Sequence, residues 1–218
     1  MATLGISLKN NKEQQELVRL MNENHKPIIF CTGNAGTGKT FAALAAALQL
    51  KQNKKYKTIV YGRNPIPLGE DMGFLPGGLE DKYGPYMGPL YDNLEAIASL
   101  SNENLNPKDL AQRIEMIPIA FLRGRSFRDT ILIIDEAQNL DLTSLKAILT
   151  RVGDYSKVVL LGSMNQIDDP RQRKKDKCDF EKVMEATINL PYVGYINLTK
   201  SMRSDWCVEL DGILGEIK

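Results

Sequence analysis

One short stretch of this 218-residue chain has the residue types and spacing needed to hold phosphate groups. GNAGTGKT, residues 33–40, fits the pattern G-x-x-x-x-G-K-[ST] in full. Glycines let a loop wrap closely around a phosphate, and its backbone N–H groups then point inward at the start of the next helix. In such a loop Lys39 reaches the β- and γ-phosphates, and the Thr40 hydroxyl ligates Mg²⁺. The predicted contacts to ATP come from Gly33, Asn34, Ala35, Gly36, Thr37, Gly38, Lys39, Thr40 and Phe41.

A pair of acids ends the most apolar run of the chain. ILIIDEAQN, residues 131–139, passes from four apolar residues straight into Asp135 and Glu136. Adjacent buried carboxylates repel each other and are tolerated beside a positive partner, so we predict that Asp135 ligates Mg²⁺. Glu136 is then placed to orient or deprotonate a water aimed at the γ-phosphate, and the alternative is that it only begins a helix. Paired acids favour hydrolysis of ATP over transfer of its phosphoryl group to a bound acceptor.

A third polar segment follows another apolar run. GSMNQID, residues 162–168, leaves the run KVVLLG. Parallel α/β sheets bind ligands at the carboxyl ends of their strands, which would place Gln166 on the same rim as Lys39 and Asp135. An amide there can sense the γ-phosphate, and the alternative is an ordinary polar loop.

The elements that must position these residues alternate along the chain. The run 131–135 lacks polar alternation, which predicts a strand covered on both faces. Residues 63–92 are dense in Gly and Pro and predict a long structured loop with at most short helices. Alternating strands and helices predict an α/β fold, a three-layer domain with a mostly parallel central sheet, and we expect one domain over residues 1–218. Strands are predicted at 27–32, 57–62, 114–120, 131–135, 157–162 and 193–199, and helices at 13–24, 41–52, 92–100, 107–114, 142–152 and 179–187.

Composition narrows the class of protein. The formal net charge is +1, so any site for nucleic acid must be a local basic group. The N-terminal residues lack the apolar segment of a signal peptide, and the Ala-rich run is too short for a membrane span. Three scattered cysteines fit a reducing compartment, so we expect a cytoplasmic protein of a bacterial cell or a phage-infected host. The only histidine, His25, has no evident partner, which argues against Ser–His–Asp catalysis.

Two segments are locally basic. FLRGRSFRD, residues 121–129, interleaves three arginines with two phenylalanines, a pattern that suits phosphate backbones and base stacking. RQRKKDK, residues 171–177, fits a solvated charge run at least as well. The predicted contacts to single-stranded RNA or DNA are Arg123, Arg125 and Arg128.

These blocks together resemble the PhoH family of P-loop ATPases, which is related to the first, RecA-like domain of superfamily 1 helicases. The resemblance runs from about residue 28 to about residue 205. Two positions depart from the family pattern: Ser163 stands where an acid is usual, and Asn34 where proline is frequent. Further matching blocks are Arg63 with Pro65, 73–82, 85–94, 121–139, 149–153 and 202–204.

The resemblance implies ATP binding and hydrolysis, an RNA-linked role, and ring-shaped homo-oligomers, with a hexamer favoured. It also implies that an early glutamine, Gln14 or Gln15, reads adenine. With room for one RecA-like domain, we expect a neighbouring copy to supply an arginine in trans, which contributes ~10³–10⁵ in rate. Arg203 is favoured for this role over Arg151, Arg123 and Arg125.

Two classes of function stay open. The first is an Mg²⁺-dependent ATPase, a helicase-like remodeller of single-stranded RNA or DNA. The second is an ATP-switched oligomer that docks other proteins without acting on nucleic acid. A small-molecule kinase is weaker, because the acid pair favours water as the acceptor and no acceptor pocket is legible.

Overall fold

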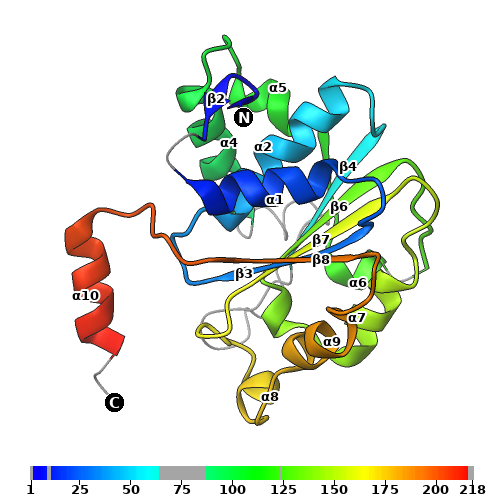
Figure 1. Cartoon of the computed structure of the whole chain (residues 1–218), viewed down its shortest axis with the longest axis vertical. Coiled ribbons are helices and arrows are strands. Elements are labelled where there is room, and N and C mark those ends of the chain that lie inside the picture. The colour runs from blue at the N-terminus through cyan, green and yellow to red at the C-terminus, as the bar shows by residue number, and fades with distance from the viewer. Residues whose placement is uncertain (1, 9–10, 64–86, 123, 216–218) are drawn as a thin grey trace, which may run out of the picture.

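Six apolar segments form one sheet in which every pair of neighbouring strands is parallel. The computed structural model describes residues 2–8, 11–63, 87–122 and 124–215 (Figure 1). The strand order is β5-β4-β6-β7-β3-β8. These strands are β3 (Ile28–Gly33), β4 (Thr58–Arg63), β5 (Ile114–Met116), β6 (Thr130–Asp135), β7 (Lys157–Gly162) and β8 (Val193–Leu198).

Helices cover both faces of this sheet (Figure 1). One layer holds α1 (Lys12–Asn22), α2 (Lys39–Gln52), α4 (Gly88–Leu100) and α5 (Pro107–Ala111), with the hairpin of β1 (Ala2–Thr3) and β2 (Ile6–Ser7) beside it. The other holds α6 (Ile119–Leu122), α7 (Leu142–Leu149), α8 (Pro170–Arg173) and α9 (Asp179–Thr187), and the 3₁₀ turn η2 (Ala137–Asn139) follows β6. A last helix, α10 (Asp205–Gly215), lies apart from both layers.

The two layers bury alternate residues of the same strands. In β6, Ile131 and Ile133 pack toward the α1–α2 layer, whereas Leu132 and Ile134 pack toward the α7–α9 layer. All six residues of β6 are buried, as its unbroken apolar run predicted. Strand residues two apart therefore face the same layer, which decides the side of the sheet on which each site residue lies.

The parallel arrangement gathers the predicted site at one edge. The carboxyl ends of all six strands meet there, so the loop after β3 lies on the same rim as Arg63, Asp135 and Ser163. Strand β7 separates β3 from β6, which leaves a gap between the phosphate loop and the acid pair. We call this rim the carboxyl edge and the opposite rim the amino edge.

Most predicted elements are confirmed, but the strand expected at 114–120 is wrong in its second half. Pairing ends after Ile117, whose N–H donates to Tyr61 O at 3.0 Å, and α6 begins at Ile119. Pro118 lies between them and has no N–H for the sheet ladder, so the chain turns into a helix instead.

Other differences concern segments without an apolar pattern. Helix α4 begins at Gly88, inside the stretch predicted as loop, and residues 64–86 of that stretch lie outside the described residues. The N-terminal hairpin, α8 and α10 were not predicted. None of the helices in the described ranges is long and apolar enough to cross a membrane.

Candidate nucleotide site

The phosphate loop forms the connection from β3 to α2. A Cβ at Gly33 would lie 2.3 Å from the carbonyl oxygen of Leu198 in the neighbouring strand β8, so only glycine fits there. Gly38 has φ 78° and ends the loop in the left-handed region just before α2 begins at Lys39. The local sequence therefore produces the predicted strand–loop–helix arrangement, with the start of α2 facing the loop.

The ammonium group of Lys39 lies folded onto this loop. Its Nζ donates to the carbonyl oxygens of Gly33 at 2.7 Å and Asn34 at 2.9 Å. Burial lowers the pKa of Lys39, and the nearby carboxylates of Glu136 and Asp135 oppose that shift. The amine thus occupies the inner side of the loop with carbonyl partners that a phosphate could replace.

Asp135 divides its two carboxylate oxygens between different partners. Oδ1 accepts from the Thr40 hydroxyl at 3.2 Å, and Oδ2 accepts from the Tyr61 hydroxyl at 2.6 Å. Arg63, opposite Asp135 in the β4–β6 register, holds its guanidinium 3.8 Å from Oδ2. Burial, followed by the charge of Asp135, raises the pKa of Tyr61 well above its ordinary value, so this hydroxyl remains a donor.

The donor set at Asp135 fits a divalent metal ion. A hydroxyl and a carboxylate oxygen are hard oxygen ligands of the kind Mg²⁺ prefers, and Oδ1 lies beside Thr40 as that role requires. Because Tyr61 holds Oδ2, the carboxylate is fixed with Oδ1 turned toward the loop. No group of three His, Cys, Asp or Glu side chains suited to a metal occurs in the described ranges, so the remaining ligands would be phosphate oxygens and water.

Glu136 is held in an unusual backbone conformation beside Asp135. Its φ of 54° and ψ of 41° lie in the left-handed region, which strains a residue with a Cβ. Its Oε2 accepts from Gln138 Nε2 at 2.7 Å, and its Oε1 lies 3.5 Å from Arg63 Nη2. Burial, followed by the charge of Asp135, raises the pKa of Glu136, as expected for a carboxylate that accepts a proton during a reaction.

Gln138 connects the acid pair to the loop after β7. This fully buried side chain donates to Glu136 and also to the carbonyl oxygen of Gln166 at 2.8 Å. Its Oε1 accepts from the N–H of Ser163 at 3.0 Å. Sequence reasoning missed Gln138 and Tyr61, because neither residue type stands out until these contacts are visible.

The predicted residues surround one cavity of about 250 Å³. Its lining includes Lys39, Thr40, Asp135, Glu136 and Gln166. The structure therefore brings together the loop, the acid pair and the glutamine, as their placement after parallel strands predicted. The remaining lining residues are Ala35, Gly36, Gly38, Phe41, Asn93, Leu161, Gly162 and Ser163.

The two candidate glutamines of α1 have different hydrogen-bond partners. Gln14 is buried, and its Nε2 donates to the carbonyl oxygen of Thr37 in the phosphate loop at 3.1 Å. Gln15 instead donates to the carbonyl oxygen of Leu8 at 2.6 Å. Of the pair, Gln14 is the one that reaches the loop.

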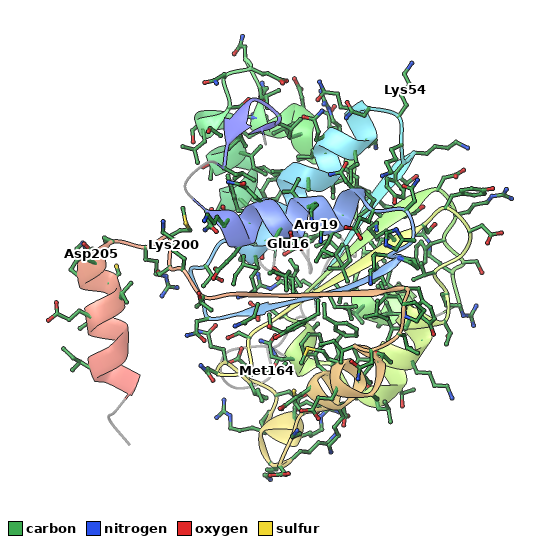
Figure 2. The ribbon with its side chains drawn as sticks, in the orientation of Figure 1. Glu16, Arg19, Lys54, Met164, Lys200 and Asp205 are labelled. Atoms are coloured by element: carbon green, nitrogen blue, oxygen red, sulfur yellow. The ribbon has the colours of Figure 1, made fainter. Side chains whose placement is uncertain are left out.

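A strand-like tail after β8 crosses the phosphate loop of the same chain. Met202 N–H donates to Gly36 O at 2.8 Å, and a Cβ on Gly36 would lie 2.6 Å from Arg203 Nε. Glu13 holds this tail by accepting from the backbone of Thr199 at 2.7 Å and Lys200 at 3.0 Å (Figure 2 labels Lys200 between β8 and α10). We predicted Arg203 as an arginine given to a neighbouring copy, and the structure places it beside its own loop.

Two of the three arginines predicted for nucleic acid, Arg125 and Arg128, do not line the cavity. Arg123 lies outside the described residues. Arg125 is paired with Glu115 at 2.7 Å and lies 5.4 Å from the centre of the Phe127 ring. Arg128 is exposed next to the start of β6, at the amino edge. Arg125 thus lies beside β5 and Arg128 lies at the edge opposite the site, and nothing in the residue pattern alone indicates the Glu115 partner.

Comparison with known proteins gives one family and several relatives. The family described as PhoH-like protein matches residues 6–210. The chain is 39% identical to Protein PhoH2 of Bacillus subtilis (strain 168) over 203 residues, 92% of this chain and 46% of that protein. It is 36% identical to Protein PhoH of Escherichia coli (strain K12) over 166 residues, 75% of this chain and 46% of that protein. The chain thus spans less than half the length of these two relatives.

Solved structures give more distant likenesses. Pif1 helicase from Candida albicans matches with a TM-score of 0.47 at 19% identity, covering 96% of this chain and 44% of that chain. Pif1 helicase from Bacteroides in complex with ADP-AlF3 and ssDNA matches with a TM-score of 0.44 at 15% identity, covering 96% and 47%. Likenesses this distant carry no argument about what the chain binds.

Proposed function

We infer a function from one premise: this chain belongs to the PhoH family, because the family match spans residues 6–210. We propose that it is an Mg²⁺-dependent ATP hydrolase. The observation that carries the proposal is the meeting of Thr40 and Asp135, whose side-chain oxygens lie 3.2 Å apart although 95 positions separate them in sequence. Lys39 and Glu136 line the same cavity, so one small space holds a phosphate loop, a metal-binding pair and a base.

In the proposed complex the loop binds the phosphate groups. Lys39 exchanges the carbonyl oxygens of Gly33 and Asn34 for the β- and γ-phosphates, which favours its charged form. Thr40 and Asp135 would hold Mg²⁺, which would offset the negative charge of the phosphates. Gln14, bonded to the loop at Thr37, is the proposed contact to adenine.

Glu136 is the proposed base for hydrolysis. It takes a proton from the attacking water, whose oxygen bonds to the γ-phosphorus while the bond to the β–γ bridging oxygen breaks, giving ADP and phosphate. Gln138 fixes its carboxylate at 2.7 Å, and burial raises its pKa toward that of an effective base. Gln166 is proposed to sense the γ-phosphate. Arg203, beside the phosphate loop of its own chain, is proposed to stabilise the negative charge that develops on the phosphate.

The substrate on which this ATPase acts is proposed to be single-stranded RNA or DNA. The exposed Arg125 and Arg128 supply local positive charge in a chain of net charge +1. Because Arg125 is already paired with Glu115, a nucleic acid would have to compete for it, and the contribution of this arginine to affinity is therefore smaller than that of an unpaired one.

A second candidate function is an ATP-switched oligomer that docks other proteins. The observation that favours it is α10, which is set apart from the domain with apolar side chains exposed, Trp206 at 67% and Ile213 at 57%. The tail leading to α10 crosses the phosphate loop, so nucleotide binding and the position of this helix share a segment. A homo-oligomer, with a hexameric ring favoured, belongs to both candidates.

Steady-state ATP hydrolysis with Mg²⁺, with and without single-stranded RNA and DNA, tests the proposal. Glu136→Gln should lower turnover by ~10²–10⁴-fold while nucleotide still binds. Glu185→Gln, an exposed acid paired with Lys177, is the matched control and should change nothing. Wild-type protein that binds no nucleotide, or full turnover in Glu136→Gln, would contradict the assignment.

Nucleic-acid stimulation separates the two candidates. The remodeller predicts faster turnover with RNA or DNA and loss of that stimulation in an Arg125→Ala, Arg128→Ala double variant. Turnover that ignores nucleic acid in the wild-type protein would favour the switch.

A further inference from the structure

One hydroxyl at the carboxyl edge has no hydrogen-bond partner among the described residues. In the described part of the structure, Ser163 Oγ is the buried side-chain oxygen or nitrogen that makes no hydrogen bond. The residue is 2% exposed and directly follows β7. Its backbone is satisfied, since its N–H donates to Gln138 Oε1 at 3.0 Å and its carbonyl oxygen accepts from Gln166 N–H at 3.2 Å.

A buried hydroxyl without a partner destabilises the fold that contains it. Ser156, which directly precedes β7 at the amino edge, shows the ordinary arrangement. Its Oγ accepts from Thr130 N–H at 3.1 Å and donates to Phe127 O at 3.0 Å. The two serines are similarly buried at opposite ends of one strand, and only the one at the carboxyl edge is unsatisfied.

The place of Ser163 indicates what could satisfy it. It belongs to the lining of the cavity that Lys39, Asp135 and Glu136 also line. A buried hydroxyl without a partner in the wall of such a cavity is suited to a bound molecule or to an ordered water.

A water bound to Mg²⁺ is the best candidate for the partner of Ser163. In protein sites Mg²⁺ is held by a few protein oxygens together with phosphates and keeps several bound waters, which need hydrogen-bond partners. Thr40 and Asp135 are the protein ligands that the described residues offer. An uncharged hydroxyl can also serve here without adding a third carboxylate to Asp135 and Glu136.

We propose that Ser163 Oγ hydrogen-bonds a water of the Mg²⁺ hydration shell in the nucleotide complex, and so acts as a positioning residue for the metal. The inference rests on the proposed function, because it requires a nucleotide–Mg²⁺ complex in this cavity. It assigns a role to Ser163, one of the two positions at which this chain departs from the family pattern.

Ser163→Ala separates this role from a structural one. Without ligand, the variant should unfold at the same temperature as the wild-type protein or a higher one, because it loses an unsatisfied group. The affinity for ADP in EDTA should be unchanged. The additional affinity that Mg²⁺ confers should fall by about tenfold or more, within the range for residues that orient metal ligands. Mn²⁺ binding to the ADP complex, followed by electron paramagnetic resonance, should weaken in parallel.

Ser156→Ala is the matched control. It should lower the unfolding temperature, because Thr130 N–H and Phe127 O lose a partner, and should leave the Mg²⁺ effect on ADP affinity intact.

Three results would overturn the inference. They are an unchanged Mg²⁺ effect in Ser163→Ala, an equal loss of ADP affinity with and without Mg²⁺, and a marked loss of stability without ligand. A wild-type protein whose ADP affinity ignores Mg²⁺ would instead contradict the proposed function itself.

Discussion

Two lysines at opposite edges of the sheet, the buried Lys157 and the half-buried Lys39, bond to carbonyl oxygens in different settings. At the amino edge, Lys157 Nζ donates to the carbonyl oxygens of Glu23 at 2.8 Å, Leu20 at 3.5 Å and Lys26. At the carboxyl edge, Lys39 Nζ donates to two carbonyl oxygens of the phosphate loop. Burial lowers the pKa of both amines.

The difference lies in what holds the carbonyl groups. Those around Lys157 belong to the end of α1 and the turn into β3, which Lys55 also ties by donating to Asn22 O. Those around Lys39 belong to a loop that a phosphate would occupy. The carbonyl groups around Lys157 are therefore held by the fold, whereas under the proposed function those around Lys39 give up the ammonium group to a phosphate.

Two serines follow the same division. Ser163 keeps an unpartnered hydroxyl at the carboxyl edge, while Ser156 makes two hydrogen bonds at the amino edge. Backbone strain does not divide the edges in this way, because Lys54, Asp129 and Tyr155 at the amino edge share the positive φ of Glu136.

The largest effect on stability is expected from Lys157→Met. It removes the ammonium donor from three carbonyl oxygens, of which Leu20 O and Glu23 O keep a backbone N–H donor, so the free energy of unfolding should fall by ~1–3 kcal/mol. Urea denaturation measures it. Lys54→Met, at an exposed position nearby (Figure 2), is the control and should change little. A Lys157→Met protein as stable as the wild type would show that Lys157 does not stabilise the amino edge.

The pH dependence of the unfolding free energy, compared between the wild type and Lys157→Met, tests the same residue further. Burial, with a smaller effect of Lys55, lowers the pKa of Lys157 from 10.5 to about 7. Between these values the unfolded chain binds a proton that the folded chain does not, so the contribution of Lys157 to stability rises as pH increases from about 7 to 10.5. Lys157→Met should lose this rise in denaturation experiments across that pH window, and an identical pH profile would contradict the assignment.

A smaller effect is expected from Tyr61→Phe. Asp135 would lose the donor that fixes Oδ2, so the increase in ADP affinity on adding Mg²⁺ should fall by about tenfold. Tyr56→Phe, in a buried tyrosine before the start of the same strand, is the control and should leave that increase unchanged. An intact Mg²⁺ effect in Tyr61→Phe would show that Asp135 needs no positioning by β4.

The smallest effect is expected at Asn34, where its Oδ1 accepts from Asn165 Nδ2 at 2.9 Å. This bond is solvent-exposed, so a double-mutant cycle of Asn34→Ala and Asn165→Ala on ATP affinity should give a coupling below ~1 kcal/mol. A coupling of several kcal/mol would mean that the loop after β7 controls the phosphate loop directly.

Much of this site could be predicted because its signals are local. The phosphate loop carries its own pattern, and the apolar runs 131–135 and 157–162 predicted covered strands that deliver Asp135 and Gln166 to one rim. Local sequence also placed the helix that becomes α2, although its bounds shifted by a residue or two.

The rest depends on contacts between distant segments. Tyr61 meets Asp135 only because β4 lies beside β6 in a register that no single strand specifies. The rotation of α1 decides that Gln14 rather than Gln15 reaches the loop. Arg125 pairs with Glu115 of β5, so part of the charge of the basic segment is already neutralised within the fold.

Nucleotide-dependent unfolding of Lys39→Met tests the central claim most directly, namely that the carboxyl edge is arranged for a ligand rather than for stability. Without nucleotide the variant should unfold at or above the wild-type temperature. Mg²⁺ and ATP at ~100 times the dissociation constant should stabilise the wild-type protein by ~2.7 kcal/mol and the variant not at all. A variant that is destabilised without nucleotide, or that gains as much from ATP as the wild type, would contradict the account.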